Sequence, residues 1–159
     1  NKEMAKVSMQ EAIDEMNQGK QIAFAIRDKD SQRIVGSTRL FRLNTQDRTI
    51  EIGHTFIMSE FQRTYVNSHA KLLLLQYIFE VLTMVRVEIC THENNQQSRK
   101  AIARIGGTLE GVLRKHRRTD EGYTRNTALF SIIDDEWPRV KENLISLSHN
   151  MEGFIYVPS

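Results

Sequence analysis

Residues 49–111 constrain the fold more than any other part of the chain. They read as a buried strand at 50–58, a polar loop at 62–68, a strongly apolar helix that begins near His69, a strand at 85–91, and a second helix. A helix of that length between two strands favours parallel neighbours in a right-handed crossover. Both helices then start at one edge of the sheet, where unpaired backbone N–H groups and helix dipoles suit an anion.

The other strands extend this unit into a mixed sheet. Strands at 22–26 and 34–43 should form a hairpin across a polar turn, and the strand at 50–58 should return antiparallel to them. A second hairpin should join 108–114 to 123–133. The alternation of strands with helices predicts an α/β domain.

Helices are predicted at both ends of the chain. Ser8 and Glu11 have the spacing of a capping box, and the helix that they open should stop at Gly19. A closing helix should begin at Asp134 or Asp135. Its packing face is supplied by Trp137, Val140 and Leu144.

Residue spacing also predicts which side chains share a face. Strand alternation places Ile50, Ile52, His54 and Phe56 on one face, and Glu51, Gly53, Thr55 and Ile57 on the other. In the helix at 95–105, helical spacing predicts a buried stripe made of Ala101, Ile102 and Ile105.

The bulk composition is that of an ordinary globular protein. The 159 residues are 40% hydrophobic and 26% charged, enough for one core without disulfides. A net charge of +2 demands no nucleic-acid partner, and the basic run at 114–118 reads first as a solvated hairpin end. Cys90 reads as a small buried hydrophobe. No apolar run approaches the roughly 20 residues that span a membrane, and we expect a cytoplasmic protein. The histidines lack metal-ligand spacing, so we expect no metal.

Several short motifs occur in an order that resembles the GNAT acyl-CoA N-acyltransferases, in particular the branch similar to ribosomal-protein-alanine N-acetyltransferases. The resemblance implies an α/β fold of the α+β kind, with a mixed, mostly antiparallel sheet that is splayed between two central parallel strands and flanked by helices. It implies one acetyltransferase domain over 1–148, without the usual first strand and helix, and a C-terminal tail at 149–159. The motifs are Glu51-Ile-Gly53, the loop at 62–67, Asn95-Gln-Gln-Ser98, Ile105-Gly106, Leu109-Glu-Gly111 and the segment 131–137.

The resemblance also implies acetyl-CoA as the co-substrate. Its pantetheine arm is expected in the splay, where it pairs with backbone near Phe56, Ile57 and Met58 and faces Asn95 and Ser98. The family usually carries Gly where this chain has Tyr65, and a small residue where it has Asn67. The segment expected to wrap the pyrophosphate is Gln62, Arg63, Thr64, Tyr65, Val66, Asn67 and Ser68.

Direct acyl transfer requires a neutral amine, a polarised carbonyl and a proton for the departing thiolate. The backbone N–H of Ile57 is expected to polarise the carbonyl. Ser98 is expected to donate to the thiolate, because Ile102 stands where many family members have a Tyr donor. The candidate bases are Glu51, acting directly or through water, and behind it His54 and Glu88.

We therefore expect an N-acetyltransferase that acts on a primary amine, either a protein N-terminus or a small amine. The alternative is a noncatalytic module with the same fold that binds acyl-CoA or an RNA or ribosomal partner; Tyr65, Ile102 and the basic run favour it. We expect no membrane partner, and no nucleic acid outside a ribosomal association. A monomer and a homodimer both stay open.

Overall fold

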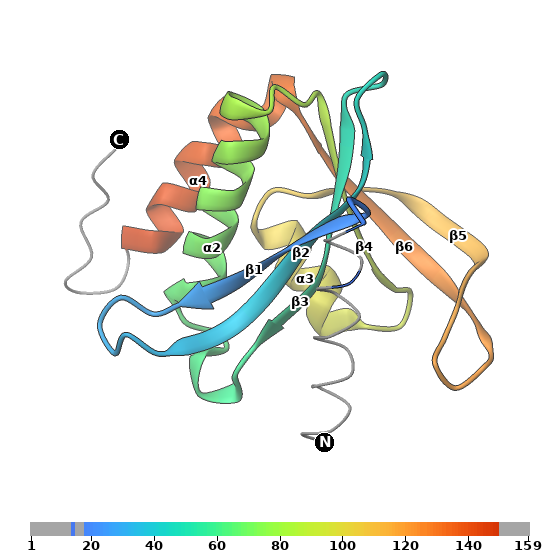
Figure 1. Ribbon diagram of the computed structural model, residues 1–159, viewed down its shortest axis with the longest axis horizontal. Coiled ribbons are helices and arrows are strands. Elements are labelled where there is room, and N and C mark those ends of the chain that lie inside the picture. Colours follow the sequence, from blue (N-terminus) through green and yellow to red (C-terminus); the bar gives the residue numbers. More distant parts are fainter. Residues whose placement is uncertain (1–13, 15–17, 150–159) are drawn as a thin grey trace.

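One mixed sheet organises the structure, a computed structural model that describes Asp14 and residues 18–149, except for the side chains of His54 and His149. Its six strands lie in the order β1-β2-β3-β4-β6-β5 (Figure 1). All neighbouring strands are antiparallel except β3 and β4, which are parallel. The predicted mixed, mostly antiparallel sheet is confirmed. The strands are β1 (Gln21–Arg27), β2 (Ile34–Asn44), β3 (Thr49–Ile57), β4 (Arg86–His92), β5 (Thr108–Arg118) and β6 (Thr124–Ile133).

Three helices pack on one face of this sheet. They are α2 (Tyr65–Gln76), α3 (Gln96–Arg104) and α4 (Trp137–His149). A π-helical turn, Tyr77–Val81, prolongs α2, which lies beside α4 (Figure 1). One core joins all three helices to the inward side chains of the strands. The predicted packing face of α4 is buried in it, with Trp137, Val140 and Leu144 at 7%, 2% and 0% exposure.

The parallel pair separates along its length. β3 and β4 are paired from Thr49 and Arg86 as far as Ile52 and Ile89. Beyond that point β3 continues beside β2 to Ile57, and β4 continues beside β6 to His92. The backbones of 53–57 and 90–92 are therefore not paired with each other, and we call this divergence the splay. It lies between the two strands for which the family resemblance implied it.

A β-bulge interrupts β3 inside the splay. Ser37 lies opposite Phe56 and Arg39 lies opposite Gly53, so Thr38 faces two residues of β3, at 54 and 55. An inserted residue reverses the side-chain alternation that follows it. The predicted faces are therefore wrong after Gly53, since Phe56 is 61% exposed whereas Ile57 packs against a small core cluster with Val35 and Val66.

Both central helices begin at side-chain caps. Thr64 is the N-cap of α2, and its hydroxyl accepts from the N–H of Val66 at 3.3 Å. The helix thus starts at Tyr65, and the predicted start near His69 is wrong because the Thr64 cap was not recognised. Asn95 caps α3 by accepting from the N–H of Ser98 at 3.0 Å.

The buried stripe of α3 is narrower than predicted. Ile102 and Ile105 are buried at 7% and 2% exposure, whereas Ala101 is exposed. In a helix of nine residues that touches the core at its C-terminal end, only one turn is covered. Ala101 was therefore predicted wrongly.

The predicted helix after Ser8 and the tail at 149–159 lie almost entirely outside the described residues. Gly19, predicted to stop that helix, has φ +71, in the left-handed region that glycine adopts freely. Among the described residues no helix combines the length and apolar character needed to cross a membrane.

Two adjacent leucines of α2 test how much the core contributes to stability. Leu72 is fully buried and Leu73 is 52% exposed. We expect Leu72→Ala to lower the free energy of unfolding by about 2–5 kcal/mol, because it leaves a cavity. Leu73→Ala should lower it by less than about 1 kcal/mol. Urea denaturation measures both, and equal losses would contradict the packing described here.

Candidate functional site

The N-terminus of α2 follows directly from the end of β3. The side-chain amide of Gln62 donates to the carbonyl of Ile57 at 2.9 Å, and the Thr64 hydroxyl donates to the carbonyl of Phe61 at 2.6 Å. Val66, in the first turn, packs against Ile57 and Met58. The structure therefore brings the predicted strand end and the predicted pyrophosphate segment together.

The segment 62–68, predicted to bind pyrophosphate, contains one left-handed residue and ends in the first turn of α2. Arg63 has φ +60, whereas Tyr65 is the first residue of α2. The conformation that Gly would adopt easily thus falls on Arg63, and Tyr65 imposes no steric problem on the loop. A first helical turn presents backbone N–H groups without helical acceptors, as an anion site requires.

The side chain of Tyr65 connects this turn to the β1–β2 hairpin. Its hydroxyl donates a short hydrogen bond to Asp28, whose other carboxylate oxygen accepts from Ser31 at 2.8 Å (backbone) and 2.6 Å (hydroxyl). The hydrogen bonds from the Ser31 hydroxyl and Tyr65 lower the pKa of Asp28 to about 2. The same bond to Asp28 is the main reason that the pKa of Tyr65 rises to about 12.

The N-terminus of α3 forms the second half of the candidate site. Because β3 and β4 are parallel, α2 and α3 both start beyond the carboxyl ends of these strands, at one edge of the sheet. The side-chain carbonyl of Asn95 already accepts the capping hydrogen bond from the N–H of Ser98. Ser98 itself is half-buried in the first turn. The two helix starts, one on each side of the splay, could together hold an extended ligand that has an anionic group.

One of the predicted backbone contacts is already engaged. The N–H of Met58 donates to the carbonyl of Val35 in β2 at 2.8 Å, so this N–H is not available to a ligand in the splay. Phe56 is exposed, and Ile57 is half-buried. The side chain of His54, a reserve candidate base, lies outside the described atoms.

Glu51 is buried on the face of the sheet opposite the helices. It is 2% exposed, and its carboxylate oxygens lie 2.7 Å from the Arg117 guanidinium and 3.5 Å from that of Arg42. Its neighbour across the parallel pair, Glu88, is more accessible and lies 3.2 Å from Arg86. An amine could therefore approach Glu51 only through water or by displacing Arg42, and this favours the indirect route.

The same face contains a protonated thiol and a cluster of cations. Burial, and then the negative charge of Glu51, raise the pKa of Cys90 to about 12. Burial, and then the charge of Arg117, lower the pKa of both Arg125 and His116. The guanidinium groups of Arg42, Arg117 and Arg125 thus all lie near Glu51.

Sequence reasoning missed two residues near the site. Arg117 was assigned to a solvated hairpin end, although it is the half-buried partner of Glu51; no short-range signal links residues 66 positions apart. Lys71 is 5% exposed inside α2 and donates to Thr55 of β3 at 2.8 Å. Its signal was available, because a single lysine interrupts the apolar sequence from Ala70 to Leu75.

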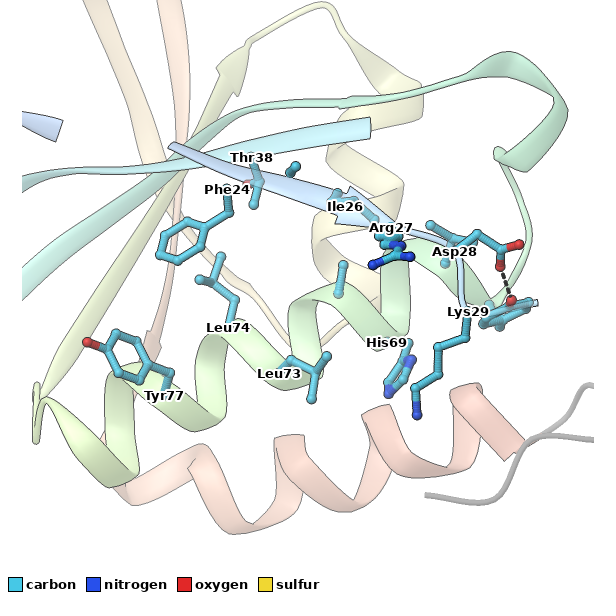
Figure 2. A pocket seen from close by; sticks show the side chains of 14 residues that line it. Phe24, Ile26, Arg27, Asp28, Lys29, Thr38, His69, Leu73, Leu74 and Tyr77 are labelled. Carbon is cyan, nitrogen blue, oxygen red and sulfur yellow. Dashed lines mark hydrogen bonds between the residues drawn. The ribbon is translucent and has the colours of Figure 1, made fainter. Parts of the chain in front are cut away.

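A cavity of about 370 Å³ lies between β1 and α2 (Figure 2). Its walls are mainly apolar, with Phe24, Leu73, Leu74 and Tyr77 among them, and Lys29 and His69 stand at one end. None of the lining residues comes from the splay. Tyr65 and Val66 also line it, so the cavity adjoins the start of α2 without reaching the splay.

No group of three or more His, Cys, Asp or Glu side chains in the described part of the chain could hold a metal ion. What the described atoms do form is an edge for an anion-bearing ligand: a splayed parallel pair followed by two helix starts.

Comparison with known proteins identifies the family. The family model described as "Acetyltransferase (GNAT) domain" matches residues 1–108. Since this is more than half of the 159 residues, the chain belongs to the GNAT acetyltransferase family.

Two curated relatives come from Bacillus subtilis (strain 168). The protein named Putative ribosomal N-acetyltransferase YdaF is 32% identical over 104 residues, covering 65% of this chain and 56% of the relative. Uncharacterized N-acetyltransferase YoaA is 24% identical over 112 residues, covering 70% and 62%. This chain thus aligns with less than two thirds of the length of either relative.

Solved structures share the fold. A GCN5-related N-acetyltransferase from Brucella melitensis is 35% identical, with a TM-score of 0.76 over 80% of this chain and 57% of that one. Mycobacterium smegmatis RimJ, solved in complex with CoA-disulfide, is 22% identical, with a TM-score of 0.73 over 86% and 65%. The second likeness concerns the fold alone.

The link between Tyr65 and Asp28 predicts a change in acid titration. A carboxyl whose pKa is lowered in the folded state contributes stability above its unfolded pKa and loses it as pH falls through the folded value. Tyr65→Phe removes one of the bonds that lower the Asp28 pKa, so this loss should begin at higher pH than in the unaltered chain. Carboxyl titration by NMR measures the shift. Tyr123→Phe, at an exposed tyrosine, is the control, and an unchanged Asp28 pKa in Tyr65→Phe would contradict the link.

Proposed function

We propose that this chain is an N-acetyltransferase that moves an acetyl group from acetyl-CoA directly to a primary amine. The observation that carries the proposal is the splay of β3 and β4 with a helix start beyond each strand. Membership of the GNAT family supports it. The RimJ structure with CoA-disulfide supports a coenzyme A ligand for this fold.

In this proposal the pyrophosphate lies at the start of α2. The backbone N–H groups of the first helical turn bind phosphate oxygens, and the helix dipole adds to the attraction. The contributing segment is Gln62, Arg63, Thr64, Tyr65, Val66, Asn67 and Ser68. The pantetheine arm extends the sheet along β3 at Phe56, Ile57 and Met58, and it faces Asn95 and Ser98 across the splay.

The reaction is one displacement at the thioester. The amine nitrogen attacks the carbonyl carbon, the carbon–sulfur bond breaks, and the electron pair leaves with sulfur. The N–H of Ile57 stabilises the oxyanion, which forms only as the reaction proceeds. The Ser98 hydroxyl donates to the departing thiolate, and the base removes the proton that the amine nitrogen loses.

For the base we propose Glu51 acting through water, with Glu88 behind it. The pairing of Glu51 with two guanidinium groups supports a water-mediated route. Glu88 is closer to solvent and is paired with Arg86.

The proposed acceptor is a protein N-terminus or a small amine. The name of the B. subtilis relative, Putative ribosomal N-acetyltransferase YdaF, supports testing ribosomal protein N-termini first. A panel of N-terminal peptides and small amines, assayed by thiol release, separates the two kinds of acceptor.

The second candidate is a noncatalytic module that binds acyl-CoA or an RNA or ribosomal partner. It rests on the arginines beside Glu51, where burial, and then the charge of Arg117, lower the pKa of Arg125. RNA binding that weakens steeply with salt, together with no turnover on any amine, would favour it.

The proposed donor role of Ser98 predicts a selective loss of rate. We expect Ser98→Ala to lower kcat by about a hundredfold or more, since a positioned proton donor contributes on that scale. The Kd for acetyl-CoA, measured by calorimetry, should change little. Its exposed neighbour provides the control Gln97→Ala, which should retain full turnover. Unchanged turnover in Ser98→Ala would remove Ser98 from the mechanism, and an unaltered chain that does not bind acetyl-CoA would contradict the proposed function.

The choice between the two carboxylates has its own test. If Glu51 is the base, Glu51→Gln should lower kcat by about a hundredfold and abolish the acidic limb of the pH profile of kcat/KM. Glu88→Gln should then retain most of kcat and the acidic limb of the pH profile of kcat/KM. The reverse pattern would assign the role to Glu88.

A further inference from the structure

Lys71 is a buried lysine that the proposed chemistry does not use. It is 5% exposed on the side of α2 that faces the sheet. Its Nζ donates to the hydroxyl of Thr55 at 2.8 Å, and that hydroxyl lies 2.9 Å from the hydroxyl of Thr38. None of the salt bridges among the described residues involves Lys71.

Burial of this ammonium does not favour folding. Removing a charged group from water is unfavourable unless an opposite charge compensates it. Burial alone lowers the pKa of Lys71 to about 8. An apolar side chain at this position, between Ala70 and Leu72, would suit the core better, so stability does not explain the lysine.

The hydrogen-bonded pair of threonines lies at the β3 bulge. Thr38 is the residue of β2 that faces two residues of β3, one of them Thr55. Thr38 is 3% exposed, whereas Thr55 is exposed even though β3 lies in the interior of the sheet. Thr55 is open because β4 has already diverged from β3 at this point.

The segment 53–57 is therefore held on fewer sides than residues 49–52, which lie between β2 and β4. It has no partner in β4, and its ladder with β2 is interrupted by the bulge. The bond from Lys71 to Thr55 ties this segment to α2, the helix whose N-terminus is proposed to bind pyrophosphate. One side chain thus connects the two regions that are proposed to hold acetyl-CoA.

We propose that Lys71 is a positioning residue for acyl-CoA: through Thr55 it holds the bulged segment of β3 at the distance from β4 that admits the pantetheine arm. This inference rests on the proposed function. Lys71 does not contact the ligand in this role. It favours binding at the expense of the stability of the core.

The test is Lys71→Met, which keeps the length of the side chain and removes the charge and the donor. The melting temperature should stay the same or rise, because the unpaired buried charge is gone. The Kd for acetyl-CoA should increase about tenfold, because the free protein then no longer holds the bulged segment in the position that binding requires. Hydrogen–deuterium exchange of amides 53–57 in the free protein should accelerate. Lys100→Met, at an exposed lysine, is the control for all three measurements.

Substitutions at Thr55 test the same hydrogen bond from its acceptor side. Thr55→Val should reproduce the weaker binding, whereas Thr55→Ser, which retains the hydroxyl, should restore most of the affinity. In the double variant Lys71→Met/Thr55→Val, the losses should not add, because both changes break one interaction.

A lower melting temperature in Lys71→Met with unchanged affinity would overturn the role and leave Lys71 a structural residue. Unchanged exchange at 53–57 would overturn it as well, whatever happens to binding. If the unaltered chain fails to bind acetyl-CoA, the proposed function fails and this role fails with it. Faster exchange at 53–57 would then still show that Lys71 restrains the bulge, so the two failures can be told apart.

Discussion

The separation of β3 from β4 after Ile52 and Ile89 is the constraint on which the rest of the structure depends. A sheet that parts in its middle is stable only if each half keeps another partner, because buried backbone groups must stay hydrogen-bonded. β2 supplies that partner on one side and β6 on the other, and a continuous helical core beneath both halves holds them together. The backbone N–H and C=O groups that β3 and β4 do not share after they separate are then available to a ligand that forms hydrogen bonds as an added strand would.

The opposite face of the sheet shows how the separated strands are braced. At Gly53, where β3 leaves β4, an added Cβ would lie 2.7 Å from the ring of Phe41. Only glycine lets that ring cover the strand, and the guanidinium groups of Arg42 and Arg117 then lie over it at 5.8 and 5.9 Å. The two cations that pack on Phe41 are also the partners of buried Glu51. A glycine, an aromatic ring and an ion pair thus form one unit that fixes the start of the splay.

Most of the fold could be predicted from the sequence, because strand alternation, the apolar helix and the turn residues are local signals. The bulge could not, since it depends on how β2 and β3 pack across the sheet, and a single inserted residue reversed the predicted faces after Gly53. For the candidate site, the two helix starts could be predicted from polar segments that follow buried strands. The pairing of Arg117 with Glu51 could not, because the two residues are 66 positions apart. Lys71 does interrupt an apolar run, but its bond to Thr55 depends on how α2 packs on the bulge.

Arg63 and Lys71 belong to the same helix–strand junction, and both oppose local stability. A left-handed arginine is strained by about 1–2 kcal/mol relative to the right-handed conformation, a strain that glycine would avoid. Arginine at position 63 places a cation beside the positive end of the α2 dipole, an arrangement that is favourable only when an anion binds there. Lys71 likewise adds a buried donor where an apolar residue would pack better. Two locally unfavourable residues, Arg63 and Lys71, at one junction are hard to reconcile with a purely structural role for that junction. They are consistent if the junction is shaped for a bound anionic ligand, whose binding energy offsets the strain that the free protein carries.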